Sequence, residues 1–157
     1  MAKIRKKTKL KSEVLRKHCV ELAKKIAKLL VGEVCEHCGR RKKDGWQIQG
    51  SHIYPEGIYR AMSTDTDNIL SLCSVCHIGG LGMLRNVKSP SWHNDPAYFV
   101  DWANKKYPKR MKELKLRARQ NQQADEQFWE IKLKQLSKQY QKLCQIQQKQ
   151  KPIVLPF

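Results

Sequence analysis

Two pairs of cysteines constrain the fold of this chain more than any other feature of its sequence. Cys35 and Cys38 form one Cys-x-x-Cys pair, Cys73 and Cys76 form another, and 34 residues separate the two pairs. Two such pairs can surround one Zn²⁺ ion with four thiolates at about 2.3 Å, and this closed shell leaves no position open for a substrate. We therefore predict a structural zinc site, because a small domain with little core gains folding free energy from such an ion.

The composition argues against a membrane protein and against disulfide bonds. Hydrophobic residues make up 40% of the 157 residues, and no window approaches the roughly 18 consecutive apolar residues that span a bilayer. Residues 1–11 are strongly basic and are not followed by the apolar core of a signal peptide. We expect a cytoplasmic protein with reduced cysteines, in which Cys19 and Cys144 are small buried residues on helices.

The balance of charge predicts a polyanionic partner. Lysine and arginine together number 32 against 14 aspartates and glutamates, so the net charge is +18 and the isoelectric point is near 9.9. DNA or RNA is the first candidate, since each neutralised phosphate adds affinity without reading sequence. Anionic lipid is the second candidate. A merely basic protein with solvated charged faces is the third interpretation, but the excess charge is spread along the whole chain.

The first of four predicted units, residues 1–32, combines a basic arm with an amphipathic helix. Residues 1–11 have almost nothing to bury, and we expect a disordered arm suited to phosphates. Ser12 is a plausible N-cap for a helix that Gly32 ends. Its apolar residues recur at spacings of three and four and line one face: Leu15, Cys19, Leu22, Ile26 and Leu29.

The second unit, residues 33–107, has short elements in place of helical periodicity. Residues 47–53 are a strand candidate. A glycine-rich run within residues 78–91 has the character of an inserted loop, and a short helix is expected to begin near Pro96. The unit therefore predicts a small mixed domain built around the cysteine pairs.

The last two units are a long helix over residues 108–150 and an apolar tail over residues 151–157. Pro108 can begin the helix, which has no internal proline or glycine and is rich in lysine and glutamine. Its apolar stripe consists of Trp129, Leu133, Leu136, Tyr140 and Leu143. Such a stripe packs on the N-terminal helix or on a second subunit. The tail either docks in the groove of a protein partner or covers the chain's own core.

Polar side chains suited to metal binding and proton transfer lie between and just after the cysteine pairs. They are His52, Arg60, Asn68, His77 and His93. His77 directly follows Cys76, so an ion bound by the second cysteine pair would also hold the backbone of His77 in place. Imidazole is a good ligand for Zn²⁺, Ni²⁺ and related ions, and it titrates near neutral pH.

Taken together, these motifs resemble the HNH, or ββα-metal, nucleases with a four-cysteine zinc scaffold. The resemblance is strongest to small phage-type members similar to the NinG recombination nucleases, and it covers residues 35–107. The motifs that carry it are Cys35-x-x-Cys38, Gly50-Ser51-His52-Ile53, Asp67-Asn68-Ile69, Leu72-Cys73-x-x-Cys76-His77, Trp92-His93-Asn94-Asp95-Pro96 and Phe99-x-x-Trp102. The resemblance implies an α+β fold with a small ββα-metal core on a four-cysteine zinc site, flanked by the N-terminal helix and the long C-terminal helix.

The resemblance also implies a role for each polar residue. His52 would act as general base on the attacking water, and Asn68 would tie the following loop together and orient that base. His77 would hold a divalent metal, Mg²⁺, Mn²⁺, Ni²⁺ or Zn²⁺, against the scissile phosphate. Arg60, eight residues after His52, is a candidate phosphate clamp, although an ordinary surface arginine is an equal alternative.

One position departs from the family pattern. Many members carry an aspartate ligand immediately before the general base, whereas Ser51 stands before His52 here. We expect His93 to complete the metal shell beside His77, with Ser51 as a weak or water-mediated ligand.

The leading interpretation is a metal-dependent DNA endonuclease that nicks one strand or cuts both. Its basic arm and helices would bind the DNA backbone. If the protein is phage-encoded, it would act in the cytoplasm of a bacterial host. The alternative is a non-catalytic zinc-scaffold protein that binds DNA in packaging or recombination. A homodimer or a protein partner, held through the long helix and the tail, is compatible with both.

Overall fold

The computed structural model describes residues 2–79, 90–120 and 124–149 and has the predicted α+β fold. Its helices and strands are α1 (Ala2–Leu30), β1 (Ile48–His52), β2 (Ile69–Cys73), α2 (Ser74–Ile78), α3 (Pro96–Lys106), α4 (Pro108–Ala118) and α5 (Glu126–Lys149). Short 3₁₀ helices lie between them, namely η1 (Lys42–Asp44), η2 (Ala61–Thr64) and η3 (Thr66–Asn68). Within these described ranges, no helix is long and apolar enough to cross a membrane.

An antiparallel hairpin followed directly by a short helix forms the centre of the molecule. Strand β1 pairs with β2 so that Ile48 lies opposite Cys73 and His52 lies opposite Ile69. The strand predicted over residues 47–53 is thereby confirmed. Helix α2 begins at the residue after β2, which gives the chain order of a ββα unit.

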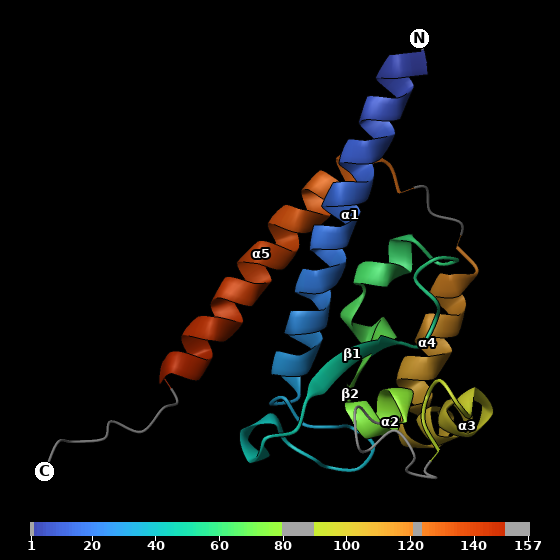
Figure 1. The fold of residues 1–157 in the computed structure, drawn as a ribbon, viewed down its shortest axis with the longest axis vertical. Helices are drawn as coiled ribbons and strands as arrows, with labels where there is room; N and C mark the ends of the chain where they lie inside the picture. Colours follow the sequence, from blue (N-terminus) through green and yellow to red (C-terminus); the bar gives the residue numbers. More distant parts are fainter. Residues whose placement is uncertain (1, 80–89, 121–123, 150–157) are drawn as a thin grey trace, which may run out of the picture.

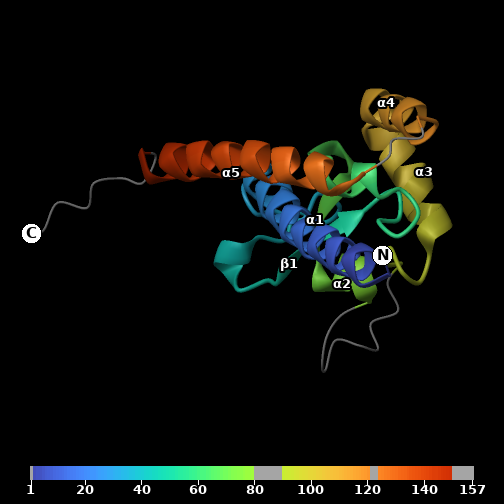
Figure 2. The same ribbon diagram turned by 90° about the horizontal axis from the view of Figure 1, so that it is seen from above.

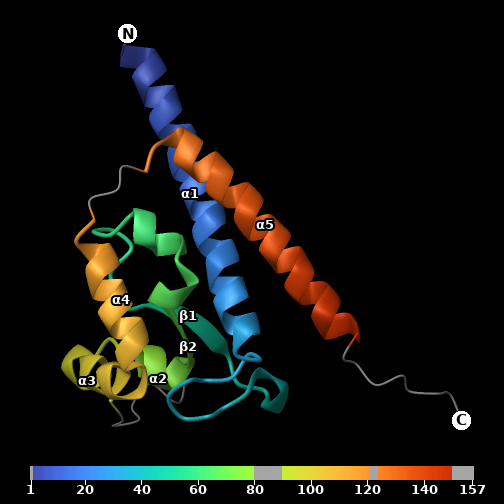
Figure 3. The ribbon, with the colours of Figure 1, turned by 180° about the vertical axis from the view of Figure 1, so that it is seen from behind.

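Helices cover both faces of this hairpin (Figures 1 and 3), with α1 on one side and α3 and α4 on the other. Side chains alternate between the two faces of a strand. Ile69 accordingly belongs to the core formed with α1, whereas Leu70 and Leu72 pack in a core with Phe99 of α3. The hairpin is therefore the middle layer of the molecule, and any site at its end lies close to several helices.

Helix α5 packs on α1, and the two helices cross in the views of Figures 1 and 2. Their shared core includes Cys19, Ala23, Ile26, Trp129 and Leu136, all of them buried. This arrangement confirms the predicted apolar stripes of both helices. It also confirms the N-terminal helix as a packing partner of the C-terminal one.

The predicted disordered arm at residues 1–11 is wrong, because α1 begins at Ala2 and runs without a break past Ser12. Lysine, arginine, leucine and alanine are good helix formers, and no glycine or proline interrupts residues 2–31. Extending a helix that is already nucleated by packing costs far less than starting one. Lys11 adds an ion pair with Glu126 of α5, at 2.6 Å.

The single helix predicted over residues 108–150 is also wrong. Helix α4 ends at Ala118, and α5 begins at Glu126. The two helices pack in different cores, because Leu114 of α4 lies with α3 and η2 residues whereas Trp129 of α5 lies against α1. One straight helix cannot reach both cores, so tertiary packing outweighs the uninterrupted helix propensity of the sequence.

The helix expected to begin near Pro96 is confirmed by α3. Its N-cap is Asp95, whose Oδ1 accepts a hydrogen bond from the Tyr98 backbone N–H at 3.0 Å, and proline occupies the first turn. Residues 80–89 of the glycine-rich run and the tail over residues 151–157 lie outside the described ranges. The boundaries of the four predicted units stay predictions.

We expect Trp129→Ala to destabilise the protein by about 3–5 kcal/mol, because the indole is fully buried between α1 and α5 and its removal leaves a cavity. The free energy of unfolding can be measured by urea titration followed by circular dichroism. Ile131→Ala is the matched control, since Ile131 lies on the same helix with half of its surface exposed. Equal losses in the two variants would contradict the assigned packing of α5 on α1.

Candidate active site and metal centre

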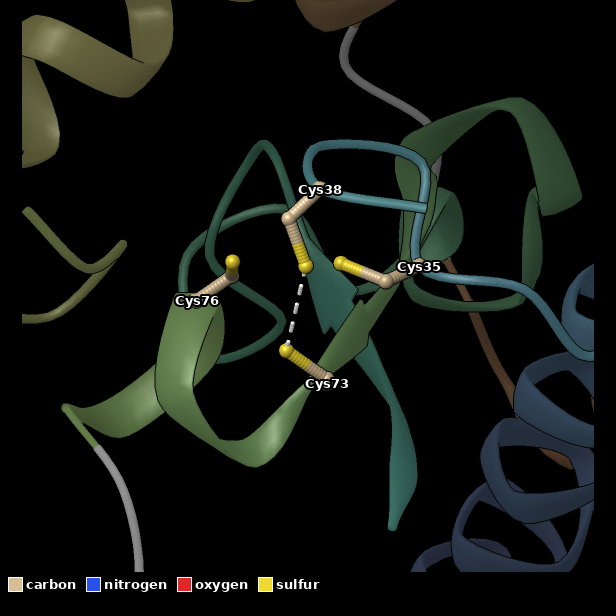
Figure 4. Close-up of side chains that lie close together, drawn as sticks. All are labelled: Cys35, Cys38, Cys73 and Cys76. Atoms are coloured by element: carbon tan, nitrogen blue, oxygen red, sulfur yellow. Dashed lines mark hydrogen bonds between the residues drawn. The ribbon is translucent and has the colours of Figure 1, made fainter. Parts of the chain in front are cut away.

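The four paired cysteines converge on one point, as Figure 4 shows. Cys35 and Cys38 come from the loop that precedes β1, Cys73 ends β2, and Cys76 lies on α2. Their sulfur atoms all lie within 4.8 Å of one another, and Cys38 Sγ is 3.6 Å from Cys73 Sγ. Four sulfurs bound tetrahedrally to Zn²⁺ would be about 3.8 Å apart. The residues therefore fit a structural zinc ion, and they leave no position open for chemistry.

Polar side chains contact two of the sulfurs in this cluster. The Arg40 guanidinium donates a long hydrogen bond to Cys73 Sγ at 3.9 Å, and His37 Nδ1 lies 3.3 Å from Cys76 Sγ. The pKa of the Cys73 thiol is held well below its ordinary value, because the thiols of Cys35 and Cys76 and the Arg40 guanidinium hydrogen-bond its sulfur. Such outer partners orient metal ligands and raise their affinity. His37 is such a partner that the sequence motifs did not predict.

His52 lies at the end of β1 with its imidazole oriented by the backbone. Its Nε2 is 2.9 Å from the carbonyl oxygen of Ser63, and a carbonyl only accepts, so Nε2 carries the proton and Nδ1 keeps a free lone pair. Nδ1 lies 3.6 Å from Oε2 of Glu56, and the side chain of His52 is only 9% exposed. Burial lowers the pKa of His52 below its ordinary 6.5, and the nearby charges of Lys24 and Arg16 lower it further.

Asn68 ties together the loop that follows His52. Its side chain is fully buried, and its Nδ2 donates to the carbonyl oxygens of Tyr54 and Met62, each at 3.1 Å. Its Oδ1 accepts from the Tyr54 backbone N–H at 2.8 Å. The carbonyl that accepts from His52 belongs to Ser63, directly after Met62. Asn68 thus reaches the base through the backbone of this loop.

His77 and His93 lie side by side although a glycine-rich run separates them in sequence. Their ring centroids are 4.8 Å apart, and the backbone N–H of His93 donates to the His77 carbonyl at 3.1 Å. The Trp92 N–H likewise donates to the Cys76 carbonyl at 2.8 Å, so this segment is docked against α2. The Oε1 of Gln49 accepts from His77 Nδ1 at 2.7 Å, which leaves Nε2 of His77 free to bind a metal.

The imidazoles of His52 and His93 both influence the pKa of His77. The pKa of His77 is lowered to about 4, first by burial and then by the charges of His93, Lys24 and His52. Adjacent neutral imidazoles are a donor set that borderline ions such as Zn²⁺ and Ni²⁺ accept, and the rings of His77 and His93 meet edge to face at 81°. Among the described residues, the cysteine quartet is the one place where three or more possible metal ligands lie close together.

Ser51 and Arg60, the two other predicted site residues, have surroundings that differ from those predicted. Ser51 is buried on β1 at 2% exposure, on the strand face that also carries Gln49. Arg60 donates from Nη2 to Oε2 of Glu13 on α1, at 3.0 Å, and is half exposed. The structure thus shows Arg60 in an ion pair with Glu13 and in no contact with His52.

Sequence reasoning missed four residues that the fold brings to the imidazoles: Arg16, Lys24, Gln49 and Glu56. Glu56 follows His52 by four residues. This spacing is visible in the sequence, but no motif singles Glu56 out. Arg16 and Lys24 lie on the polar face of α1, where they cannot be distinguished from the other basic residues of that helix. Their proximity to the hairpin depends on how α1 packs.

Comparison with known protein families matches residues 35–79 to the model described as HNH endonuclease. The matched segment is less than a third of the chain, and it contains both cysteine pairs together with His52, Asn68 and His77. Comparison with curated proteins and with solved structures gave no match. An HNH domain on a four-cysteine cluster indicates a nuclease or another protein that binds nucleic acid.

We expect the wild-type protein to carry one zinc ion in the quartet and Cys38→Ser to lose it, together with cooperative unfolding. Cys38 is the exposed member of the quartet, so its substitution removes a ligand without opening the core. Elemental analysis of the purified protein and thermal unfolding measure the two effects. Cys144→Ser, outside the quartet, is the control and should keep the metal. Retention of stoichiometric zinc by Cys38→Ser would disprove the site.

Proposed function

We propose that this protein is a metal-dependent HNH DNA endonuclease that hydrolyses phosphodiester bonds with His52 as general base. The orientation of His52 carries the proposal. Its Nε2 proton is committed to the Ser63 carbonyl, so Nδ1 is an unprotonated acceptor at the end of a strand, within the segment that matches the HNH model. An acceptor in this state is what activation of a water molecule needs.

The proton transfer can be followed atom by atom. Nδ1 of His52 takes a proton from water as the water oxygen attacks phosphorus, and the bond from phosphorus to the 3′ oxygen breaks. The carboxylate of Glu56, 3.6 Å from Nδ1, stabilises the imidazolium that forms. The products are a 5′-phosphate and a 3′-hydroxyl, the latter protonated from solvent. His52 then returns its proton to water.

His77 and His93 would hold the catalytic divalent ion, with Gln49 keeping the proton of His77 on Nδ1 and its Nε2 directed to the metal. When bound, this ion supplies Lewis-acid stabilisation of the negative charge that develops on the phosphate oxygens. The low pKa of His77, about 4, keeps its ligand nitrogen unprotonated at neutral pH. The imidazole donors favour Ni²⁺ or Zn²⁺ over Mg²⁺.

DNA is the proposed substrate, and contacts with its backbone would dominate affinity. The net charge of +18 and the basic surfaces of α1, α4 and α5 suit phosphates and carry no sequence preference by themselves. Nicking of one strand and cleavage of both strands are distinguished in the assay that follows.

We expect His52→Ala to reduce cleavage of supercoiled plasmid by about 10²–10⁴-fold, because it removes the general base. Nicked and linear products are separated on agarose gels after incubation with Mg²⁺, Mn²⁺, Ni²⁺ or Zn²⁺, with a chelator as blank. His18→Ala is the matched control, since His18 is an exposed histidine on α1.

Wild-type activity in His52→Ala would overturn the assigned base. A wild-type protein that binds the plasmid but cleaves it with none of these ions would instead identify a non-catalytic DNA-binding protein.

We expect the acid limb of the pH profile of kcat/KM to have its midpoint below pH 6.5. Burial disfavours the charged imidazolium of His52, so its pKa is lowered, and the base stays neutral and active until the pH falls below that of an exposed histidine. Glu56→Gln should move the midpoint lower still, because it removes the carboxylate that favours the protonated form. Single-turnover rates at constant ionic strength give the midpoint, and a value at or above 6.5 contradicts the assignment.

A further inference from the structure

Lys24 of α1 lies directly on the strand that carries His52. A Cβ atom on Gly50 would be 2.8 Å from Lys24 Cγ and 2.9 Å from Lys24 Cβ, so the stem of the lysine occupies the space that any other residue at position 50 would fill. The side chain of Lys24 is only 25% exposed. The close packing of a lysine stem on a glycine therefore fixes where the ammonium group can lie.

The ammonium of Lys24 is held near carboxylates without a close ion pair. Nζ lies 3.6 Å from Glu21 Oε1 and 3.9 Å from Glu56 Oε2, both beyond a normal hydrogen bond. Oε2 of Glu56 is itself buried and has no hydrogen-bond partner among the described residues. The side chains of Lys24, Glu56 and His52 thus lie near one another without normal hydrogen bonds between them. The ammonium can therefore pair with a further charged group without losing a short ion pair.

Two other basic side chains of α1, those of Arg16 and Lys28, have hydrogen-bond partners. Arg16 pairs with Glu13 through two nitrogens, the shorter contact being 2.7 Å, and Lys28 Nζ donates to the Ile48 carbonyl at 3.5 Å. Nζ of Lys24, by contrast, lies 3.9 Å from the same Glu56 oxygen that is 3.6 Å from Nδ1 of His52, so the ammonium is on the side of His52 that carries the free lone pair. An anion bound at Nδ1 of His52 would lie beside Nζ of Lys24.

We propose that Lys24 is a further catalytic residue, which contacts a non-bridging oxygen of the scissile phosphate. This inference rests on the proposed nuclease function and deepens it. Lysine is a compact point charge, and a phosphate oxygen would replace the loose contacts with Glu21 and Glu56 by a direct ion pair. The negative charge on that oxygen grows as water attacks, so the cation stabilises the transition state more than the bound substrate. Glu56 is then left to stabilise the protonated His52.

The test compares Lys24→Met with Lys25→Met in the full-length protein. Both variants remove one positive charge from neighbouring positions of α1, but Lys25 is exposed to solvent. We expect the single-turnover rate at saturating enzyme, with Mn²⁺, to fall about 10²-fold in Lys24→Met and to stay within about two-fold in Lys25→Met. Lys24→Arg should restore part of the rate. Bound zinc and the melting temperature confirm that each variant is folded.

The possible results test the role of Lys24 independently of the proposed nuclease function. An active wild type with equal rates in Lys24→Met and Lys25→Met overturns the inference and leaves the nuclease function standing. An inactive wild type overturns the function, and Lys24 is then judged by equilibrium binding of a short DNA duplex without added divalent ion. A greater loss of affinity in Lys24→Met than in Lys25→Met supports phosphate binding, and equal losses overturn it.

Should Lys24→Met lose its zinc, Lys24→Gln and Lys25→Gln are compared in their place. Gln keeps a polar head on the buried stem, so it disturbs folding less. The expected and overturning results are the same for this pair.

Discussion

The convergence of four cysteine sulfurs is the constraint on which the rest of this structure depends. Two five-residue strands and a five-residue helix bury too little apolar surface to be stable alone. Four neighbouring sulfurs also repel one another once ionised, so they stay together only around a cation. The cation would join the loop before β1 to the junction of β2 and α2 and thereby hold His77, the residue after Cys76, at the edge of the hairpin. Folding and assembly of the site are then one event.

Helix α1 has two functions in this architecture. One of its faces forms the core with α5, through Cys19, Ala23 and Ile26, and contributes the packing that the small hairpin lacks. The adjoining face lies on β1, where Gly50 admits the stem of Lys24. A helix that lies outside the matched HNH segment therefore supplies positive charge to the site inside it. Loss of packing between α1 and α5 would reach the site through this contact.

The electrostatics around His52 and His77 favour neutral imidazoles. Burial and neighbouring positive charges lower the pKa of His52 and that of His77, so both rings are neutral at neutral pH. Glu56 supplies the compensating carboxylate, with an oxygen that is buried and not yet hydrogen-bonded. In the proposed reaction, these preorganised charges would stabilise developing charge without reorganising.

Local patterns in the sequence were enough to predict the cysteine cluster, strand β1, the start of α3 and the apolar stripes of α1 and α5. Each depends on the spacing of nearby residues, and spacing is what a sequence displays. The proximity of His93 to His77 was also expected from the motifs, whereas the break between α4 and α5 and the placement of Lys24 over Gly50 were decided by tertiary structure. They depend on which helix packs on which face, and that choice results from the combined burial of residues far apart in the chain. Lys24 and His52 come close to the same carboxylate, that of Glu56, only after that packing is complete.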